Sequence, residues 1–215
     1  MESYNNASLV RLIGELEKMP GIGPKTAQRL AFYLLKSEKI EVEKLAGSIL
    51  EAKEKIKYCS VCFNMTEVDP CAICSSPRRD RSLICVVEEP MDIVALDNTG
   101  AFKGLFHVLM GSISPLDGIG PEDLKIRELL IRIGKENTKE VVIATNPDVA
   151  GEATAIYLSK LIKPLGVKVS RLAQGMPPSG PSGTSRDSWG CRTSSDARQT
   201  TLLTCGSNSL RLRPV

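Results

Sequence analysis

The fold is set by a short apolar run that ends in two carboxylates, Leu83-Ile84-Cys85-Val86-Val87-Glu88-Glu89-Pro90. Continuous apolar character that is partly β-branched is typical of a strand buried on both faces. Similar runs cover residues 140–145 and 168–172. Helical patterns separate the runs, at residues 91–97, 122–135 and 152–161. The alternation predicts an α/β fold, a doubly wound parallel sheet with helices on both faces.

Polar residues follow two of these predicted strands. Glu88 ends the first, and Asn146-Pro147-Asp148 ends the second. Ligands of open α/β sheets gather at the carboxyl ends of the strands, where Glu88 and Asp148 could together hold Mg²⁺. The alternative is a set of solvated loop carboxylates that cap helices, and the spacing alone favours it.

Three helices are predicted before the sheet, at residues 8–18 with Ser8 as N-cap, 24–36 and 41–57. The first two flank a turn, Met19-Pro20-Gly21-Ile22-Gly23-Pro24, which two prolines and two glycines exclude from a helix.

This turn is a candidate phosphate site. Gly21 and Gly23 allow a tight turn whose amides lie at the start of the next helix, where an anion binds well. Lys25 lies beside them and Arg29 one helical turn further along. The pattern resembles a helix-hairpin-helix motif, which grips the DNA backbone regardless of sequence. The alternative is a plain turn between packed helices.

A similar string, Asp117-Gly118-Ile119-Gly120-Pro121, is followed by Glu122 and Asp123. Carboxylates repel phosphate and suit the first turn of a helix, so this copy predicts a loop and a helix start.

Four of the seven cysteines form two C-x-x-C pairs, Cys59 with Cys62 and Cys71 with Cys74. Four thiolates at this spacing are typical of a closed, structural Zn²⁺ site with no open position for catalysis. Two disulfides or unused thiols are the alternatives, which a reducing compartment disfavours.

The chain has 215 residues and a net charge of +3. Residues 178–215 hold five arginines and two aspartates, which accounts for the whole net charge. DNA binding by the rest must therefore use local patches or several copies. The apolar runs are too short to span a bilayer, and the N-terminus lacks the pattern of a signal peptide, so we expect a cytoplasmic protein.

The order of these motifs resembles the RecR family of recombination mediators. The matching strings include Leu16-Glu17-Lys18-Met19-Pro20-Gly21-Ile22-Gly23, Cys85-Val86-Val87-Glu88-Glu89-Pro90 and Ala144-Thr145-Asn146-Pro147. The resemblance covers roughly residues 3–177. It implies a helix-hairpin-helix domain at 1–57, a four-cysteine zinc module at 58–77 and a Toprim-like domain at 78–177.

The resemblance also implies a function. RecR proteins act with RecO and RecF to help load the RecA recombinase on single-stranded DNA. Members form dimers and tetrameric rings that encircle DNA, so we expect a homo-oligomer in the bacterial cytoplasm, near the nucleoid, that binds single- and double-stranded DNA.

The sequence departs from the pattern twice. Catalytic Toprim enzymes have Asp-x-Asp where this chain has Asn146-x-Asp148, which weakens a Mg²⁺ site and favours a non-catalytic scaffold. Residues 178–215 lack the family's ending and are rich in Ser, Thr, Gly and Arg, which predicts an atypical, irregular tail.

Two other functions remain open. One is a Mg²⁺-dependent Toprim nuclease, primase or topoisomerase. The other is a protein-interaction module whose hairpin is only structural. The single histidine, His107, lies in an apolar run with no evident nucleophile, so we expect it to pack or hydrogen-bond rather than catalyse.

Overall fold

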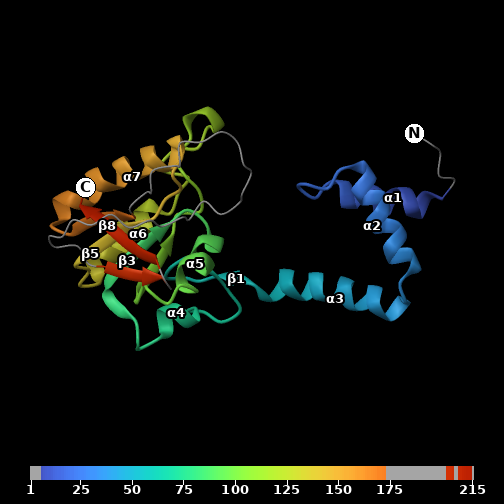
Figure 1. The fold of residues 1–215 in the computed structure, drawn as a ribbon, viewed down its shortest axis with the longest axis horizontal. Coiled ribbons are helices and arrows are strands. Elements are labelled where there is room, and N and C mark those ends of the chain that lie inside the picture. The colour runs from blue at the N-terminus through green and yellow to red at the C-terminus, as the bar shows by residue number, and fades with distance from the viewer. Residues whose placement is uncertain (1–5, 173–201, 206–207, 215) are drawn as a thin grey trace. The chain divides into compact units, whose positions relative to one another are not determined.

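The computed structural model describes residues 6–172, 202–205 and 208–214. The chain divides into two compact units, Met1–Ile56 and Lys57–Val215 (Figure 1).

The first unit holds three helices, α1 (Ala7–Glu17), α2 (Pro24–Lys36) and α3 (Lys39–Lys55). Asn6 is the N-cap residue of α1, so Ser8 lies inside the first turn and is not the cap predicted from its side chain. Asparagine suits an N-cap at least as well as serine, and Ala7 is a strong helix former.

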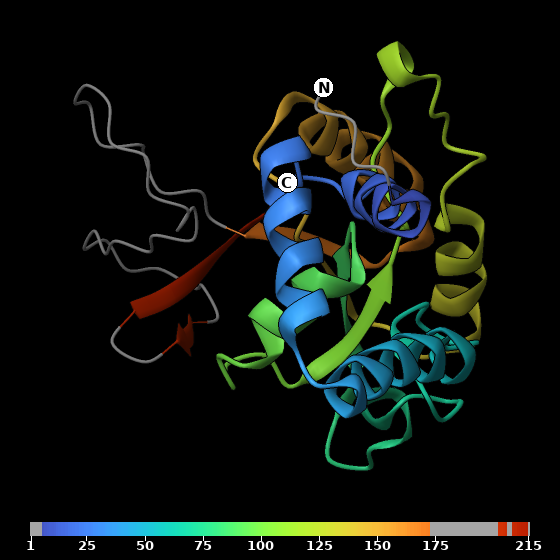
Figure 2. The same ribbon diagram turned by 90° about the vertical axis from the view of Figure 1, so that its right-hand side faces the viewer.

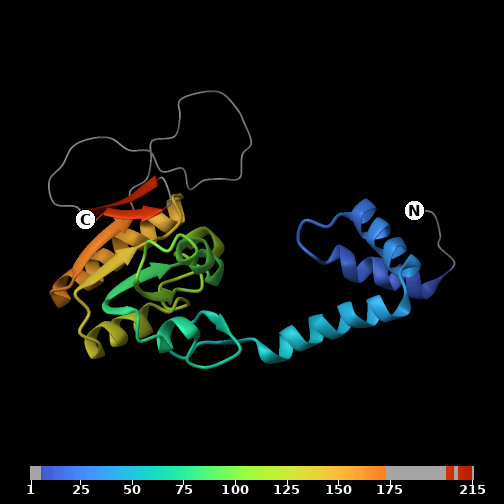
Figure 3. The ribbon, with the colours of Figure 1, turned by 60° about the horizontal axis from the view of Figure 1, so that its bottom comes forward.

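Helices α1 and α2 pack through a small core of Leu9, Ile13, Ala27 and Ala31. The two alanines let the helices approach closely. By contrast, α3 has no buried residue, and Figure 3 shows it extending away from the α1–α2 pair.

The second unit begins with a small module. Strand β1 (Lys57–Tyr58) pairs antiparallel with β2 (Met65–Thr66), and a single helical turn, α4 (Ala72–Ser75), follows.

A six-stranded sheet in the order β4-β3-β5-β6-β8-β7 runs through the rest of this unit. Strands β3 (Asp80–Val87), β4 (Gly104–Val108), β5 (Glu140–Ile143) and β6 (Lys168–Leu172) are parallel. The predicted parallel α/β sheet is confirmed.

Alternate residues of β3 point into two separate cores, as the pleat of a strand requires. Ile84 and Val86 pack with residues of α6 (Ile126–Lys135) and α7 (Val149–Ile162). Cys85 and Val87 pack with residues of α5 (Pro90–Asp97) and with Phe63 and Ile73 of the small module. Helices therefore cover both faces, and the four-cysteine module shares one face with α5.

Three sequence predictions in this unit need correction. Strand β4 was not predicted, because Gly104 and His107 interrupt its apolar run, although all five of its residues are buried. Helix α6 begins at Ile126 rather than Glu122, because the Asp123 carboxylate accepts the Gly120 N–H at 2.9 Å and closes a turn first. Helix α7 begins earlier than predicted, at Val149, because Asp148 caps it.

The connection from β4 to α6 carries the second Gly-Ile-Gly string as a loop, as predicted. It contains the 3-10 turn η1 (Pro115–Asp117), which stands at the tip of the loop in Figure 2. A second such turn, η2 (Lys163–Leu165), joins α7 to β6.

The tail is partly regular. Strand β8 (Asn208–Pro214) pairs antiparallel with β6, and β7 (Leu202–Cys205) pairs with β8, which Figure 3 shows in red beside β6 in orange. The prediction of an irregular tail is therefore wrong for these residues. Leu210 and Leu212 alternate with Arg211 and Arg213, a strand pattern that the surrounding Ser and Gly content obscured. Residues 178–201, also predicted to be irregular, lie outside the described residues.

Within the described ranges, no helix combines the length and the apolar character that crossing a bilayer requires.

Candidate functional site

The turn between α1 and α2 has the backbone of a helix-hairpin-helix. Gly21 adopts a φ of +81°, a left-handed conformation that other residues rarely adopt. The Ile22 N–H donates to Met19 O at 3.1 Å and closes the turn. Gly23 is the N-cap of α2, and Pro24 takes the first helical position, where proline is favoured.

Helix α2 begins with unsatisfied amides. Gly23 has no side chain that could cap the helix, and Ala27 is the first residue of the helix whose N–H bonds back to the Gly23 carbonyl. The amides of Gly23, Lys25 and Thr26 form no hydrogen bond within the part of the chain that the structure describes. Free amides at the positive end of a helix dipole attract an anion.

Lys25 and Arg29 are exposed, and neither forms an ion pair among the described side chains. They are four residues apart, so both lie on the same side of α2. The helix contains no Asp or Glu that could neutralise them. The structure thus brings the four predicted residues of the hairpin to one end of α2, as an exposed cationic helix start.

The second site is formed by the four cysteines, all of them buried and free of disulfide bonds. Their Sγ atoms lie within 4.8 Å of one another, and those of Cys62 and Cys71 are 3.5 Å apart. A tetrahedral zinc with Zn–S bonds of about 2.3 Å places its sulfurs about 3.8 Å apart, so the cluster fits this ion. Cys59 and Cys62 lie in the loop between β1 and β2, and Cys71 and Cys74 at α4.

The cysteine module is attached directly to the sheet. The Val108 N–H of the edge strand β4 donates to Cys62 O at 2.9 Å, and the Arg81 guanidinium donates to Cys74 O at 3.1 Å. Both C-x-x-C turns are therefore bonded to residues of the sheet, one to β4 and one to β3. The four cysteines are therefore held against the sheet, as expected of a metal site that stabilises the fold.

His107 lies beneath the module and is fully buried. Its Nε2 is 2.9 Å from Lys125 O, and its ring meets Phe63 edge-on with centroids 5.5 Å apart. Burial lowers the pKa of His107 to about 4, so the ring is neutral at pH 7. The prediction that this histidine packs and hydrogen-bonds is confirmed.

At the carboxyl ends of β3 and β5 the structure brings Glu88 and Asn146 together. One carboxylate oxygen of Glu88 accepts the Asn146 N–H at 3.0 Å, and the other accepts the side-chain amide at 2.6 Å. Glu88 is 4% exposed, and this burial raises its pKa. The alternative of a solvated carboxylate therefore does not hold for Glu88.

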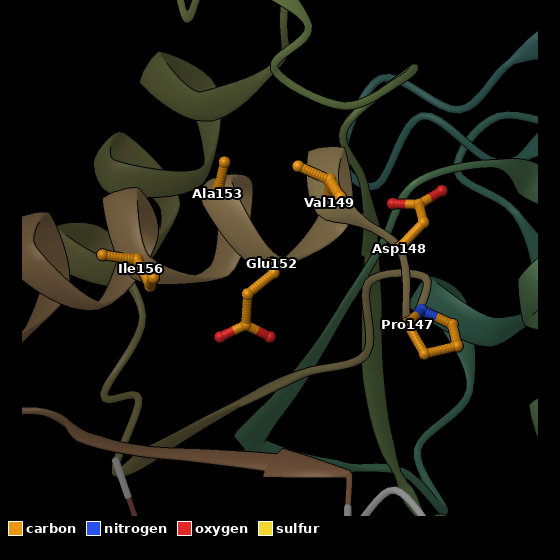
Figure 4. A pocket seen from close by; sticks show the side chains of 6 residues that line it. All are labelled: Pro147, Asp148, Val149, Glu152, Ala153 and Ile156. Atoms are coloured by element: carbon orange, nitrogen blue, oxygen red, sulfur yellow. The ribbon is translucent and has the colours of Figure 1, made fainter. Parts of the chain in front are cut away.

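Asp148 has a different role. Its Oδ1 accepts the Gly151 N–H at 2.6 Å and caps α7, as the alternative interpretation of the strand-end carboxylates proposed. Asp148 and Glu152 line a shallow pocket together with Val149 and Ile156. Figure 4 shows the carboxylates of Asp148 and Glu152 pointing in different directions. Glu152 is held by Arg171 through two hydrogen bonds of 2.6 Å.

Sequence reasoning missed the part played by Gly151. A Cβ on Gly151 would collide with the Asn146 carbonyl oxygen and would lie 2.8 Å from Glu88 Oε1. The glycine therefore lets the start of α7 approach the Glu88–Asn146 pair. The only sequence signal was its position three residues after a capping aspartate.

Comparison with known proteins assigns three parts of the chain. Residues 9–53 match the RecR helix-hairpin-helix family, residues 56–76 the four-cysteine zinc finger domain of RecR and residues 82–173 the Toprim domain. Recombination protein RecR of Moorella thermoacetica is 58% identical over 177 residues, which are 82% of this chain and 89% of that protein. The chain belongs to the RecR family.

Other RecR relatives agree. The relative from Pelodictyon phaeoclathratiforme is 56% identical over 179 residues, which are 81% of this chain and 88% of that protein. The relative from Heliobacterium modesticaldum is 57% identical over 170 residues, which are 79% of this chain and 85% of that protein. The RecR zinc finger match contains all four cysteines, and the RecR hairpin match contains Lys25 and Arg29. The Toprim match ends at residue 173, before the atypical tail.

Proposed function

We propose that this RecR-family chain is a non-catalytic, DNA-binding scaffold of recombinational repair, which acts with RecO and RecF to help load RecA on single-stranded DNA. The exposed cationic start of α2 carries the proposal. Its free amides, with Lys25 and Arg29 unpaired among the described side chains, form a site for backbone phosphate with no feature that reads bases.

Several copies of the chain would bind DNA together. Outside the tail its charges balance, so one hairpin supplies only a few phosphate contacts. A homo-oligomer, a dimer or a tetrameric ring, would multiply these contacts and the overall affinity. It would bind single- and double-stranded DNA in the cytoplasm, near the nucleoid.

The strand-end carboxylates argue for a scaffold rather than a Mg²⁺-dependent nuclease or topoisomerase. Both oxygens of Glu88 accept hydrogen bonds from Asn146, and Asp148 caps α7. We therefore expect no strand cleavage, polymerisation or relaxation with Mg²⁺ or Mn²⁺. Activity that Glu88→Gln abolishes would favour the enzyme instead.

The four-cysteine site would hold one structural Zn²⁺ per chain. Zinc would join the loop between β1 and β2 to α4, in a segment too small to have a core of its own. We expect Cys62→Ser to lower the zinc content and expose the module to protease, while DNA affinity changes less. Elemental analysis without zinc would contradict this assignment.

Loading of RecA tests the function as a whole. With purified RecO, RecA and DNA coated by single-strand-binding protein, the wild-type chain should shorten the delay before RecA hydrolyses ATP. Lys25→Ala/Arg29→Ala should lose this effect. The control Lys44→Ala/Lys53→Ala removes the same charge from exposed positions on α3 and should retain it. Equal behaviour of the two double variants would contradict the role of the hairpin.

A further inference from the structure

The cationic side of α2 continues beyond the hairpin. Lys25, Arg29, Tyr33 and Lys36 are spaced by four, four and three residues, so they follow one another along a single side of the helix. Ala27 and Ala31, which pack against α1, lie on the opposite side. The four side chains therefore face away from the core of the first unit.

Tyr33 is unusual on this side because it is a large aromatic residue with 67% of its surface exposed. Within the described ranges, its ring and hydroxyl form no hydrogen bond and no aromatic contact. Its backbone belongs to the helix, and its carbonyl also accepts from the side chain of Ser37. The ring therefore contributes little to the fold and is free to meet a ligand.

The charges around Tyr33 favour an anionic ligand. Arg29 lies one turn before it and Lys36 one turn after it, and α2 has no carboxylate. Along the helix axis the two cations are about 10 Å apart, with the aromatic ring between them. An aromatic face between two cations is the arrangement that proteins use for single-stranded nucleic acid, where bases stack on the ring and phosphates meet the cations.

We propose that Tyr33 is a stacking platform for one base of single-stranded DNA, with Arg29 and Lys36 on the phosphates at either side. The inference rests on the proposed function, because it extends the phosphate site of the hairpin along the same helix. A stacking platform needs a base with a free face. Bases inside a duplex are stacked on their neighbours, so Tyr33 contributes to single-stranded DNA alone and gives the site a preference that the phosphate contacts lack.

The test compares Tyr33→Ala with Tyr33→Phe in the full-length chain. The three ligands are a thymidine oligonucleotide, an abasic oligonucleotide of the same length and charge, and a hairpin duplex. We expect Tyr33→Ala to bind the thymidine oligonucleotide about five- to tenfold more weakly, within the range known for one stacked base. Affinity for the abasic strand and the duplex should be unchanged. Tyr33→Phe retains an aromatic face and should bind as the wild type does.

Two controls make the result specific. Leu35→Ala removes another exposed apolar side chain of α2, one that points to a different side, and should leave all three affinities unchanged. The double variant Tyr33→Trp/Trp189→Phe moves the sole tryptophan of the chain onto α2, so its fluorescence should be quenched by the thymidine oligonucleotide and not by the abasic strand.

An unchanged affinity of Tyr33→Ala for the thymidine oligonucleotide would overturn the inference, as would equal losses on all three ligands. Failure of the proposed function looks different. In that case Lys25→Ala/Arg29→Ala would bind every ligand as the wild type does, whatever Tyr33 contributes.

Discussion

Helices α2 and α7 begin in different ways, and the difference separates a binding surface from an internal support. Helix α2 starts at Gly23 with no side-chain cap, and its nearby cations have no ion-pair partner among the described side chains. Helix α7 starts at Asp148, whose carboxylate bonds to the Gly151 N–H, and its Glu152 is paired with Arg171. The first helix start offers amides and positive charge to an external anion, whereas the second is capped by its own aspartate and has its glutamate paired within the chain.

The same contrast extends to the residues whose chemistry is best suited to catalysis. Glu88 and His107 are both buried, and each is held by a hydrogen bond inside the second unit. The exposed cations of the hairpin, Lys25 and Arg29, can bind but cannot perform chemistry on DNA unaided. Burial of Glu88 and His107, together with exposure of the hairpin cations, therefore favours a scaffold.

The largest expected effect is a difference in stability between alanine variants of the two glycines at these helix starts. We expect Gly151→Ala to lower the free energy of unfolding of the second unit by about 3 kcal/mol or more, because the new methyl group would collide with Asn146 and approach Glu88. Gly23→Ala meets no atom within 4 Å at an ordinary φ of −86°, so we expect it to change the stability of the first unit by less than about 1 kcal/mol. Urea unfolding of the two variants checks this. Equal losses in the free energy of unfolding would contradict the difference between the two helix starts.

A pH-dependent effect should arise from His107. Its pKa is about 4 in the folded chain, below the ordinary value of 6.5, so the folded state favours the neutral ring. The stability it contributes is present above pH 6.5 and is lost as the pH falls towards 4. At pH 5 the loss is roughly 2 kcal/mol.

Proton NMR reports this directly, because His107 is the only histidine. Its ring resonances should show no titration between pH 8 and 5.5. A midpoint near 6.5 in the folded protein would show that the ring is solvated, contrary to the account of an internal residue.

An effect of similar size is expected at the carboxylate pair. Asn146→Asp removes the amide donor that lies 2.6 Å from Glu88 and adds a second negative charge, so we expect a loss of about 2 kcal/mol at pH 7. Glu88→Gln/Asn146→Asp restores a donor facing a carboxylate and should recover most of the stability. If the double variant is no more stable than Asn146→Asp, the pair does not act as a unit.

Much of the fold was predictable because residues that start or end helices and strands are clear in the sequence. Pro24 and the two glycines before it fix the start of α2, and the apolar run at 83–87 identifies a buried strand. Strand β4 was missed because Gly104 and His107 interrupt the continuous apolar run that identifies a buried strand. The tail strands were missed because two alternating leucines are a weak signal among serines and glycines.

The site was predictable only in part. Parallel strands bring Glu88 and Asn146 to the same edge, as expected, although they are 58 residues apart. The sequence showed that Asn146 lacks a charge. It did not show that the amide would bond to Glu88, because that depends on the register of β3 and β5 and on the close approach that Gly151 allows.

The most direct test of the central claim is the salt dependence of DNA affinity, measured for the wild type, Lys25→Ala/Arg29→Ala and Lys44→Ala/Lys53→Ala. If the start of α2 holds phosphate, the hairpin variant should bind all sequences more weakly, and the slope of log K against log salt should flatten by about one unit for each lost contact. The α3 variant should keep the wild-type slope. A hairpin variant with wild-type affinity and slope would contradict the account.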